Sequence, residues 1–127
     1  MIKQFSIQTS RRNEFIDITA QIQGLVKEVS EGVATVFVPH TTSAVTINEN
    51  ADPDVPRDIL NKLENLIPQQ DNHSHMEGNS DAHIKASLFG SSVNVIIKDG
   101  RLLLGTWQSV FFCEFDGPRK RMFYVQL

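Results

Sequence analysis

Two tight-turn signals divide the C-terminal third of the chain and constrain its fold more than any other feature. Asp99-Gly100 is a dipeptide that favours a type I′ hairpin, and Asp116-Gly117-Pro118 marks a second turn. Apolar segments rich in β-formers flank these turns at 93–98, 101–115 and 121–126. Strands joined by tight turns pair antiparallel. We therefore expect a three-stranded antiparallel meander in this part of the protein.

The N-terminal quarter predicts two strands followed by a helix. Residues 3–7 and 14–18 alternate apolar and polar side chains, and we expect these two strands to pair across the polar turn between them. From Ile18 onwards the apolar residues recur at helical spacing. Asp17 is a candidate N-cap for this helix, and Gly32 is a candidate for its end.

The middle of the chain predicts two buried strands and a second amphipathic helix. Residues 33–38 and 44–47 are rich in β-branched side chains, and the apolar stripe of 54–67 has helical spacing that Pro68 brings to an end. Strands and helices follow one another without regular βαβ alternation. The expected fold is therefore α+β, with a largely antiparallel β-sheet packed against two main helices, in a single domain over 1–127.

A long polar segment separates this helix from the C-terminal strands. Residues 69–83 contain almost no apolar side chains, and loops of this length inside a compact domain are usually functional or disordered. Residues 84–89 fit a short helix closed by Gly90, but six residues do not distinguish a helix from a strand.

Composition excludes several classes of protein. The 127 residues carry 15 acidic and 12 basic side chains, so a formal net charge of −3 gives no overall reason to bind nucleic acid or an anionic membrane. No apolar run approaches the roughly 20 residues that cross a bilayer. The first residues lack the apolar core of a secretory signal, and the single cysteine has no internal partner for a disulfide. We expect a cytoplasmic protein.

Cys113 and Glu114 occupy opposite faces of the strand expected over 106–116. Cys113 shares its face with Phe111 and Phe115, which favours a small buried side chain over a reactive thiolate. Glu114 shares the other face with Gln108. A carboxylate among phenylalanines requires a partner if it is buried, and the alternative is an exposed strand glutamate.

The four histidines are the most informative polar residues. His40 follows a predicted buried strand, and His73, His75 and His83 lie in the long polar segment. Three imidazoles brought together by a fold would suit a divalent transition metal with one position left open for water. For each histidine alone an exposed or structural role is the commoner outcome, and no H-E-x-x-H spacing is present.

Three catalytic motifs are incomplete. His75-Met76-Glu77 matches the first half of a zinc deaminase signature, but the P-C-x-x-C half is absent. There is no P-loop and no G-x-G-x-x-G, so a nucleotide cradle has no support. Ser43 near His40 fits a hydroxyl nucleophile with its base only weakly, because no third orienting group is defined.

Two polar clusters remain as candidate ligand-binding groups. Arg119-Lys120-Arg121 is a basic run whose guanidinium groups suit phosphate or carboxylate, although a solvated strand end has the same composition. Residues 48–52 carry oxygens that could hold a hard cation or orient a ligand, or form an ordinary connection to the helix.

Four segments together resemble the YjbQ-like family of secondary thiamine-phosphate synthases. They are His40-Thr41-Thr42-Ser43-Ala44 with Asn48-Glu49-Asn50, the stretch HMEGNSDAHIK at 75–85, Gly105-Thr106-Trp107-Gln108, and Glu114-Phe115-Asp116-Gly117-Pro118-Arg119. Each segment is weak on its own. Four of them in the same order, at compatible spacing and over nearly the whole chain, are specific.

The resemblance implies a compact α+β fold, a homotrimer and a divalent-metal site. The metal ligands that it implies are His40, His75 and His83, whereas His73 lies outside the matched segments and is expected to be a loop residue.

The resemblance also implies a pocket around these histidines. Glu114 and Gln108 would line that pocket as catalytic residues, with Asn48 and Arg119 as ligand-binding residues.

The implied reaction joins a hydroxymethylpyrimidine diphosphate to a thiazole phosphate and releases pyrophosphate. A cation or an arginine must stabilise the departing diphosphate, and Arg119 or Arg121 could serve. Diphosphate chemistry usually employs Mg²⁺ on oxygen ligands, whereas three histidines prefer a softer, zinc-like metal. This mismatch favours thiamine-phosphate synthesis as a weak side activity.

The expected function is therefore a metal-dependent enzyme acting on a small phosphorylated molecule. The alternative is a non-catalytic trimeric module that binds a divalent metal or a small phosphorylated ligand.

Overall fold

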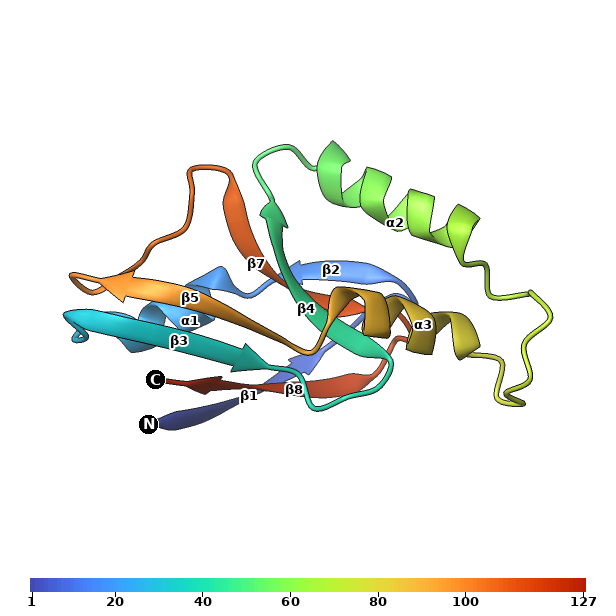
Figure 1. Cartoon of the computed structure of the whole chain (residues 1–127), viewed down its shortest axis with the longest axis horizontal. Coiled ribbons are helices and arrows are strands. Elements are labelled where there is room, and N and C mark those ends of the chain that lie inside the picture. The colour runs from blue at the N-terminus through green and yellow to red at the C-terminus, as the bar shows by residue number, and fades with distance from the viewer.

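A computed structural model describes residues 1–127 as two antiparallel sheets and three helices (Figure 1). The five-stranded sheet has the order β1 (Ile2–Gln8), β8 (Lys120–Gln126), β3 (Glu31–Phe37), β5 (Ser92–Lys98) and β6 (Arg101–Leu102). The three-stranded sheet has the order β2 (Glu14–Asp17), β7 (Gln108–Glu114) and β4 (Ser43–Glu49). Every strand pair is antiparallel, so the expected α+β fold is confirmed.

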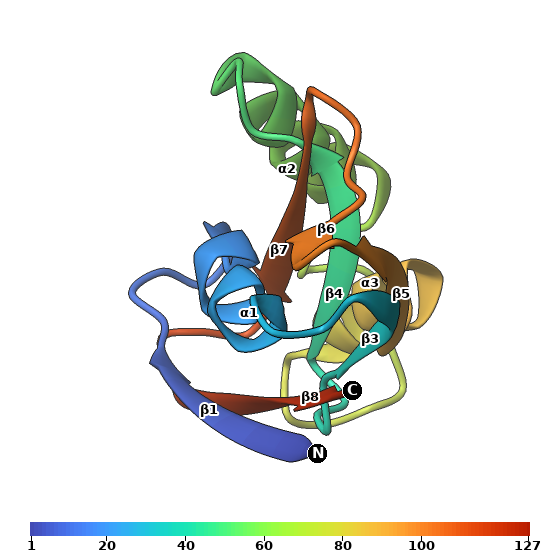
Figure 2. The same ribbon diagram turned by 90° about the vertical axis from the view of Figure 1, so that its left-hand side faces the viewer.

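The three-stranded sheet separates two apolar cores, and the helices cover them. Helix α1 (Thr19–Val26) lies in the angle between the two sheets, where Ile22 and Val26 are fully buried in the larger core (Figure 2). Helices α2 (Asp54–Leu66) and α3 (Ser80–Phe89) lie on the other side of the three-stranded sheet. Ala82 and Ala86 of α3 join Phe111 of β7 in the smaller core. The three-stranded sheet is therefore covered on both faces.

The periodicity of the sequence predicts where the helices lie more accurately than where they begin and end. The second helix ends one residue before the expected 54–67. The first helix ends at Val26, well before Gly32. At the start of this helix, the Asp17 carboxylate accepts a hydrogen bond from the Thr19 N–H at 2.9 Å. Residues 84–89 are helical rather than extended, and the helix already begins at Ser80.

The expected strand pairings are right at one turn and wrong at two places. Asp99 and Gly100 have φ angles of 51° and 74°, as a type I′ turn requires, and β5 pairs with β6 across them. However, β1 pairs with β8 and not with β2, which pairs with β7. The C-terminal meander is also wrong, because β6 and β8 belong to one sheet and β7 to the other.

Gly117 lies where two turns of the chain approach each other closely. A Cβ atom at this position would lie 2.1 Å from the carbonyl oxygen of Arg11, and the Gly117 N–H donates to the Arg12 carbonyl at 3.0 Å. The turn between β7 and β8 therefore packs directly against the turn between β1 and β2. Only glycine leaves room for this approach.

Strand β7 is buried on both faces, which explains its unbroken apolar run. Phe112 lies in the larger core, and Phe111, Cys113 and Phe115 lie in the smaller one. The predicted aromatic surroundings of Cys113 are confirmed. Burial raises the pKa of the Cys113 thiol, so it is protonated at neutral pH.

A partly buried network of charges connects the turn before β2 to α2 and α3. Arg12 donates two hydrogen bonds to the Asp81 carboxylate, both at 2.9 Å. Lys85, one turn further along α3 and fully buried, donates to Asp81 at 3.0 Å and also to Glu64 of α2. This network fixes the position of α3 relative to both of its neighbours.

Asp81 carries a strongly shifted pKa. Burial alone would raise it, but the hydrogen bonds and charges of Arg12 and Lys85 outweigh that effect and lower the pKa to about 2 from 3.8.

None of the three helices is both long and apolar enough to cross a bilayer.

Asp81→Asn tests the energetic role of this network. Since the folded pKa is below the unfolded one, the ionised carboxylate stabilises the fold above about pH 4, and we expect about 2 kcal/mol of this stability to be lost as the pH falls towards 2. Urea unfolding between pH 2 and 6 should show a shallower acid slope for Asp81→Asn than for the wild type. Asp58→Asn, at an exposed site on α2, is the control; an unchanged slope in Asp81→Asn would contradict the assignment.

Candidate functional site

A polar cavity of about 470 Å³ opens where four segments of the chain meet. The segments are the connection from β3 to β4, the segment before α3, the start of α3, and the turn between β7 and β8 with the beginning of β8. No hydrophobic residue lines the cavity, and the lining residues are Pro39, His40, Thr41, Thr42, His75, Glu77, Asn79, His83, Asp116, Arg119 and Arg121.

The structure brings together the three histidines that the resemblance singled out. His40, His75 and His83 all line the cavity. The rings of His75 and His83 lie edge to face with centroids 5.4 Å apart, and His75 Nε2 is 3.9 Å from a carboxylate oxygen of Glu77. His73 lies outside the cavity, with its Nε2 atom 3.4 Å from the carbonyl oxygen of Pro68.

His40 is held by the backbone of β8. The Met122 N–H donates to His40 Nε2 at 3.0 Å, so in the neutral ring the proton is on Nδ1. Burial lowers the pKa of His40, and the positive charge of Arg121 lowers it further. His40 is therefore a neutral imidazole at pH 7, with a donor at Nδ1.

The histidines suit a metal ion in kind but do not converge on one in this geometry. No three histidine, cysteine, aspartate or glutamate side chains are arranged as they would be around a metal ion. A neutral imidazole has one ring lone pair, and His40 uses it to accept the Met122 N–H. His40 could bind a metal only after this hydrogen bond breaks, whereas His75 and His83 make no comparable bond to the backbone.

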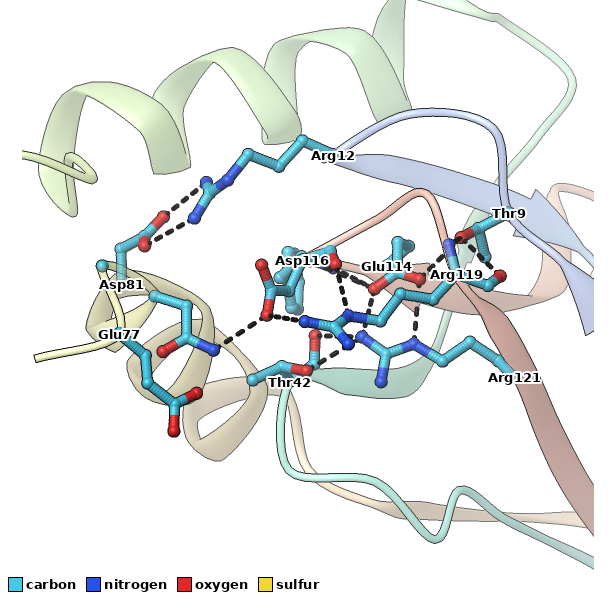
Figure 3. A network of polar contacts seen from close by, with 12 residues as sticks. Thr9, Arg12, Thr42, Glu77, Asp81, Glu114, Asp116, Arg119 and Arg121 are labelled. Atoms are coloured by element: carbon cyan, nitrogen blue, oxygen red, sulfur yellow. Dashed lines mark hydrogen bonds and ion pairs between the residues drawn. The ribbon is translucent and has the colours of Figure 1, made fainter. Parts of the chain in front are cut away.

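A buried ion pair forms the wall behind His40. Arg121 Nε donates to one carboxylate oxygen of Glu114 at 2.9 Å, and Arg121 Nη2 donates to the other oxygen. The Thr9 hydroxyl donates to the first oxygen at 2.7 Å, and the backbone N–H groups of Phe115 and Asp116 donate to the second at 3.1 Å (Figure 3). The Glu114 carboxylate is fully buried and has five donors.

A second, more exposed pair lies at the mouth of the cavity. Arg119 donates from Nη2 to the Asp116 carboxylate at 3.0 Å and from Nε to the Asp116 carbonyl at 2.8 Å. Asn79 donates to the same carboxylate oxygen at 2.8 Å, which connects the start of α3 to this turn. Figure 3 shows Arg119 and Arg121 directed towards the two acidic side chains. The Nη1 atoms of both arginines make no hydrogen bond within the protein.

Two predicted site residues lie away from the cavity. Gln108 is at the opposite end of β7 from Glu114, six residues or about 20 Å along the strand. Its side-chain oxygen accepts the Gly105 N–H at 2.8 Å, within the turn before β7. Asn48 pairs with Ser109 at that same end, and its side chain accepts the Glu49 N–H. The expectation of one pocket for these residues and the histidines is wrong within this chain.

Glu114 also differs from the expectation. It does not line the cavity, because Arg121 lies between its carboxylate and the open space, and its oxygens are engaged. The alternative of an exposed strand glutamate is wrong as well. Glu114 therefore holds Arg121 in position and does not itself line the cavity.

The sequence indicated the remaining polar residues of the cavity only as members of matched segments. Glu77 and Asn79 lie between His75 and His83, and Asp116 belongs to the second turn. Arg121 was a candidate as part of the basic run and as a group to stabilise the departing diphosphate. The two-residue alternation of β8 places Arg121 and Phe123 on its inner face, and this pattern was the available signal.

Comparison with known proteins gives one consistent family. The family model for UPF0047 protein YjbQ-like matches residues 3–127. The chain is 56% identical over 129 residues to a UPF0047 protein of Methanocaldococcus jannaschii, covering all of this chain and 94% of that one. It is 47% identical over 130 residues to the UPF0047 protein YugU of Bacillus subtilis, covering all of this chain and 98% of that one.

Solved structures give the same result for the fold. A YjbQ/UPF0047 family protein from Clostridium acetobutylicum superposes with a TM-score of 0.96 at 55% identity, over 98% of each chain. A YbjQ-like protein from Sulfolobus solfataricus superposes with a TM-score of 0.93 at 31% identity, over 98% of this chain and 94% of that one.

Glu114→Gln tests the buried pair in the cavity wall. The substitution keeps the shape of the side chain but leaves the Arg121 charge buried without its counter-charge, so we expect the free energy of unfolding to fall by about 3 kcal/mol. Urea denaturation at pH 7 measures this loss, with the exposed Glu28→Gln as the control. A loss no larger than that of the control would contradict a structural role for the pair.

Proposed function

Because the chain belongs to the YjbQ-like UPF0047 family and has a wholly polar cavity, we propose that it is an enzyme acting on a small phosphorylated molecule in that cavity. The reaction class is the one that the family resemblance implies. A hydroxymethylpyrimidine diphosphate is joined to a thiazole phosphate, pyrophosphate leaves, and this activity is secondary.

The free guanidinium nitrogens are the observation that carries this proposal. The Nη1 atoms of Arg119 and Arg121 have no partner in the protein, and both residues line one cavity. The two carboxylate pairs hold the guanidinium groups before a ligand arrives, so little side-chain entropy is lost on binding. Phosphate oxygens are natural acceptors for such donors. As the C–O bond to a diphosphate breaks, the same donors stabilise the charge on the leaving oxygen.

The imidazoles supply the proton chemistry in this proposal. His40 is neutral and carries its proton on Nδ1, so it donates a hydrogen bond to an anionic ligand without adding charge. His83 lies in the same cavity and is the second candidate for moving a proton. Glu114 acts through Arg121 by holding its orientation.

A divalent metal ion, zinc-like for imidazole ligands or Mg²⁺ for the diphosphate, is part of the proposed function. His75 and His83 would hold it, and His40 would join them only after releasing the Met122 N–H. When bound, the ion would supply positive charge to phosphate oxygens.

The second candidate function is a non-catalytic module that binds the same ligand or a metal. The engagement of Glu114 and Asp116 favours it, because neither carboxylate is free to act as a base. Release of pyrophosphate from the two precursors distinguishes the candidates, since a binding module releases none. A cytoplasmic location and a homotrimeric assembly complete the proposal, and light scattering of the purified protein measures the assembly.

Arg119→Gln is the test of the phosphate site. Removal of one charged donor should weaken the binding of pyrophosphate about tenfold, as measured by calorimetry at fixed ionic strength. The matched control is Lys120→Gln, which removes the same charge from the neighbouring exposed position outside the cavity. Equal losses in the two variants would mean that only overall charge matters, and would contradict the site.

His83→Ala tests the metal. Protein purified from cells grown with added zinc should contain metal in the wild type and substantially less in the variant, because two imidazoles become one. Elemental analysis measures the content, and His73→Ala, at a histidine outside the cavity, is the control. Equally low metal in the wild type and His83→Ala would contradict metal binding here.

A further inference from the structure

A second cavity adjoins the first and has a different chemical character. It has a volume of about 480 Å³ and shares His40, Thr41 and His83 with the first cavity. No arginine, lysine, aspartate or glutamate lines the second cavity. The two cavities therefore lie next to each other as a charged compartment and an uncharged compartment, with the imidazoles of His40 and His83 in the shared wall.

Small side chains keep the second compartment open. His83 and Ser87 are one helical turn apart on α3 and so lie on the same face, and the Ser87 hydroxyl donates to the His83 carbonyl at 2.8 Å. Gly90 has a φ of +94° and ends the helix, which allows the chain to turn back into β5 at the edge of the compartment. The remaining wall, at Ala86 and Ser91, is equally small.

Ser43 provides an independent indication that the compartment binds a polar group. It lines the second compartment, is 1% exposed, and its hydroxyl oxygen is buried without any hydrogen-bond partner. A buried hydroxyl without a partner destabilises a protein unless something satisfies it. A polar ligand atom in this compartment would do so.

We propose that this compartment is a binding subsite for the neutral, polar ring of the substrate, while the phosphate group occupies the charged compartment. The inference rests on the proposed function and adds to it the place where the ring binds. An uncharged ring with hydroxyl, amino or ring-nitrogen groups fits hydroxyl and imidazole walls, whereas a second phosphate would find no cation there. The bond between the ring's methylene carbon and the diphosphate oxygen would then lie beside His40 and His83. This bond breaks, and pyrophosphate leaves, as the thiazole nitrogen bonds to the same carbon.

The experiment uses two separate probes on the whole protein. Inorganic phosphate reports on the charged compartment, and the neutral alcohol 4-amino-5-hydroxymethyl-2-methylpyrimidine reports on the uncharged one. In phosphate-saturated wild-type protein, the pyrimidine should shift the backbone amide resonances of Ser87, Gly90 and Ser91. Ser87→Phe should abolish these shifts and leave phosphate binding unchanged. Leu88→Phe, an exposed α3 position outside both cavities, should retain both kinds of binding.

Ser43→Ala separates a ligand-binding role from a structural one. Removal of the unpartnered hydroxyl should leave the unfolding midpoint unchanged or higher, because a buried unsatisfied group is lost. The affinity for the pyrimidine should nevertheless fall about three- to tenfold. A structural role would instead lower the midpoint.

The outcomes distinguish this inference from the proposed function. If phosphate binds but the pyrimidine leaves the three amides unchanged, or binds Ser87→Phe as well as the wild type, the second subsite is wrong and the phosphate site stands. If phosphate itself fails to bind the wild-type protein, the proposed function is wrong.

Discussion

The buried pair of Glu114 and Arg121 is the interaction on which the rest of this structure depends. It joins the end of β7 to β8, which belong to different sheets, and its carboxylate also accepts the hydroxyl of Thr9 at the end of β1. Arg121 donates in addition to the Thr42 hydroxyl at 2.9 Å, just before β4. One ion pair thus fixes four segments at the place where the sheets meet. Removal of either charge would leave the other buried and unpaired, which proteins tolerate poorly.

The cavity follows from this arrangement. Because Glu114 engages one side of the Arg121 guanidinium, its Nη1 atom remains available to a ligand. Asp116 holds Arg119 in the same manner, and Asn79 ties this turn to α3, which carries His83. The buried Asp81 and Lys85 then fix α3 from its other face. The two arginines and the helix that carries His83 are therefore held in place before any ligand binds.

Local patterns in the sequence predicted the elements of the fold but not their partners. Helical spacing located α1 and α2, the Asp99-Gly100 dipeptide located a hairpin, and alternation assigned Cys113 to the aromatic core. The pairing of β1 with β8 joins residues more than a hundred positions apart, and no local pattern encodes it. Strand partners are set by which apolar faces meet in three dimensions.

The sequence predicted only part of the candidate site, because the site too depends on which distant segments meet. The family resemblance identified His40, His75 and His83, which do line one cavity, but it grouped them with Gln108 and Asn48, which lie at the far end of β7 and β4. The carboxylate of Glu114 proved to support Arg121 rather than face a ligand.

The central claim is that Arg119 and Arg121 together form a phosphate site. A crystal structure of the protein with pyrophosphate tests it most directly. The account predicts phosphate oxygens within hydrogen-bonding distance of both Nη1 atoms, and pyrophosphate bound elsewhere, with these atoms facing only water, would contradict it.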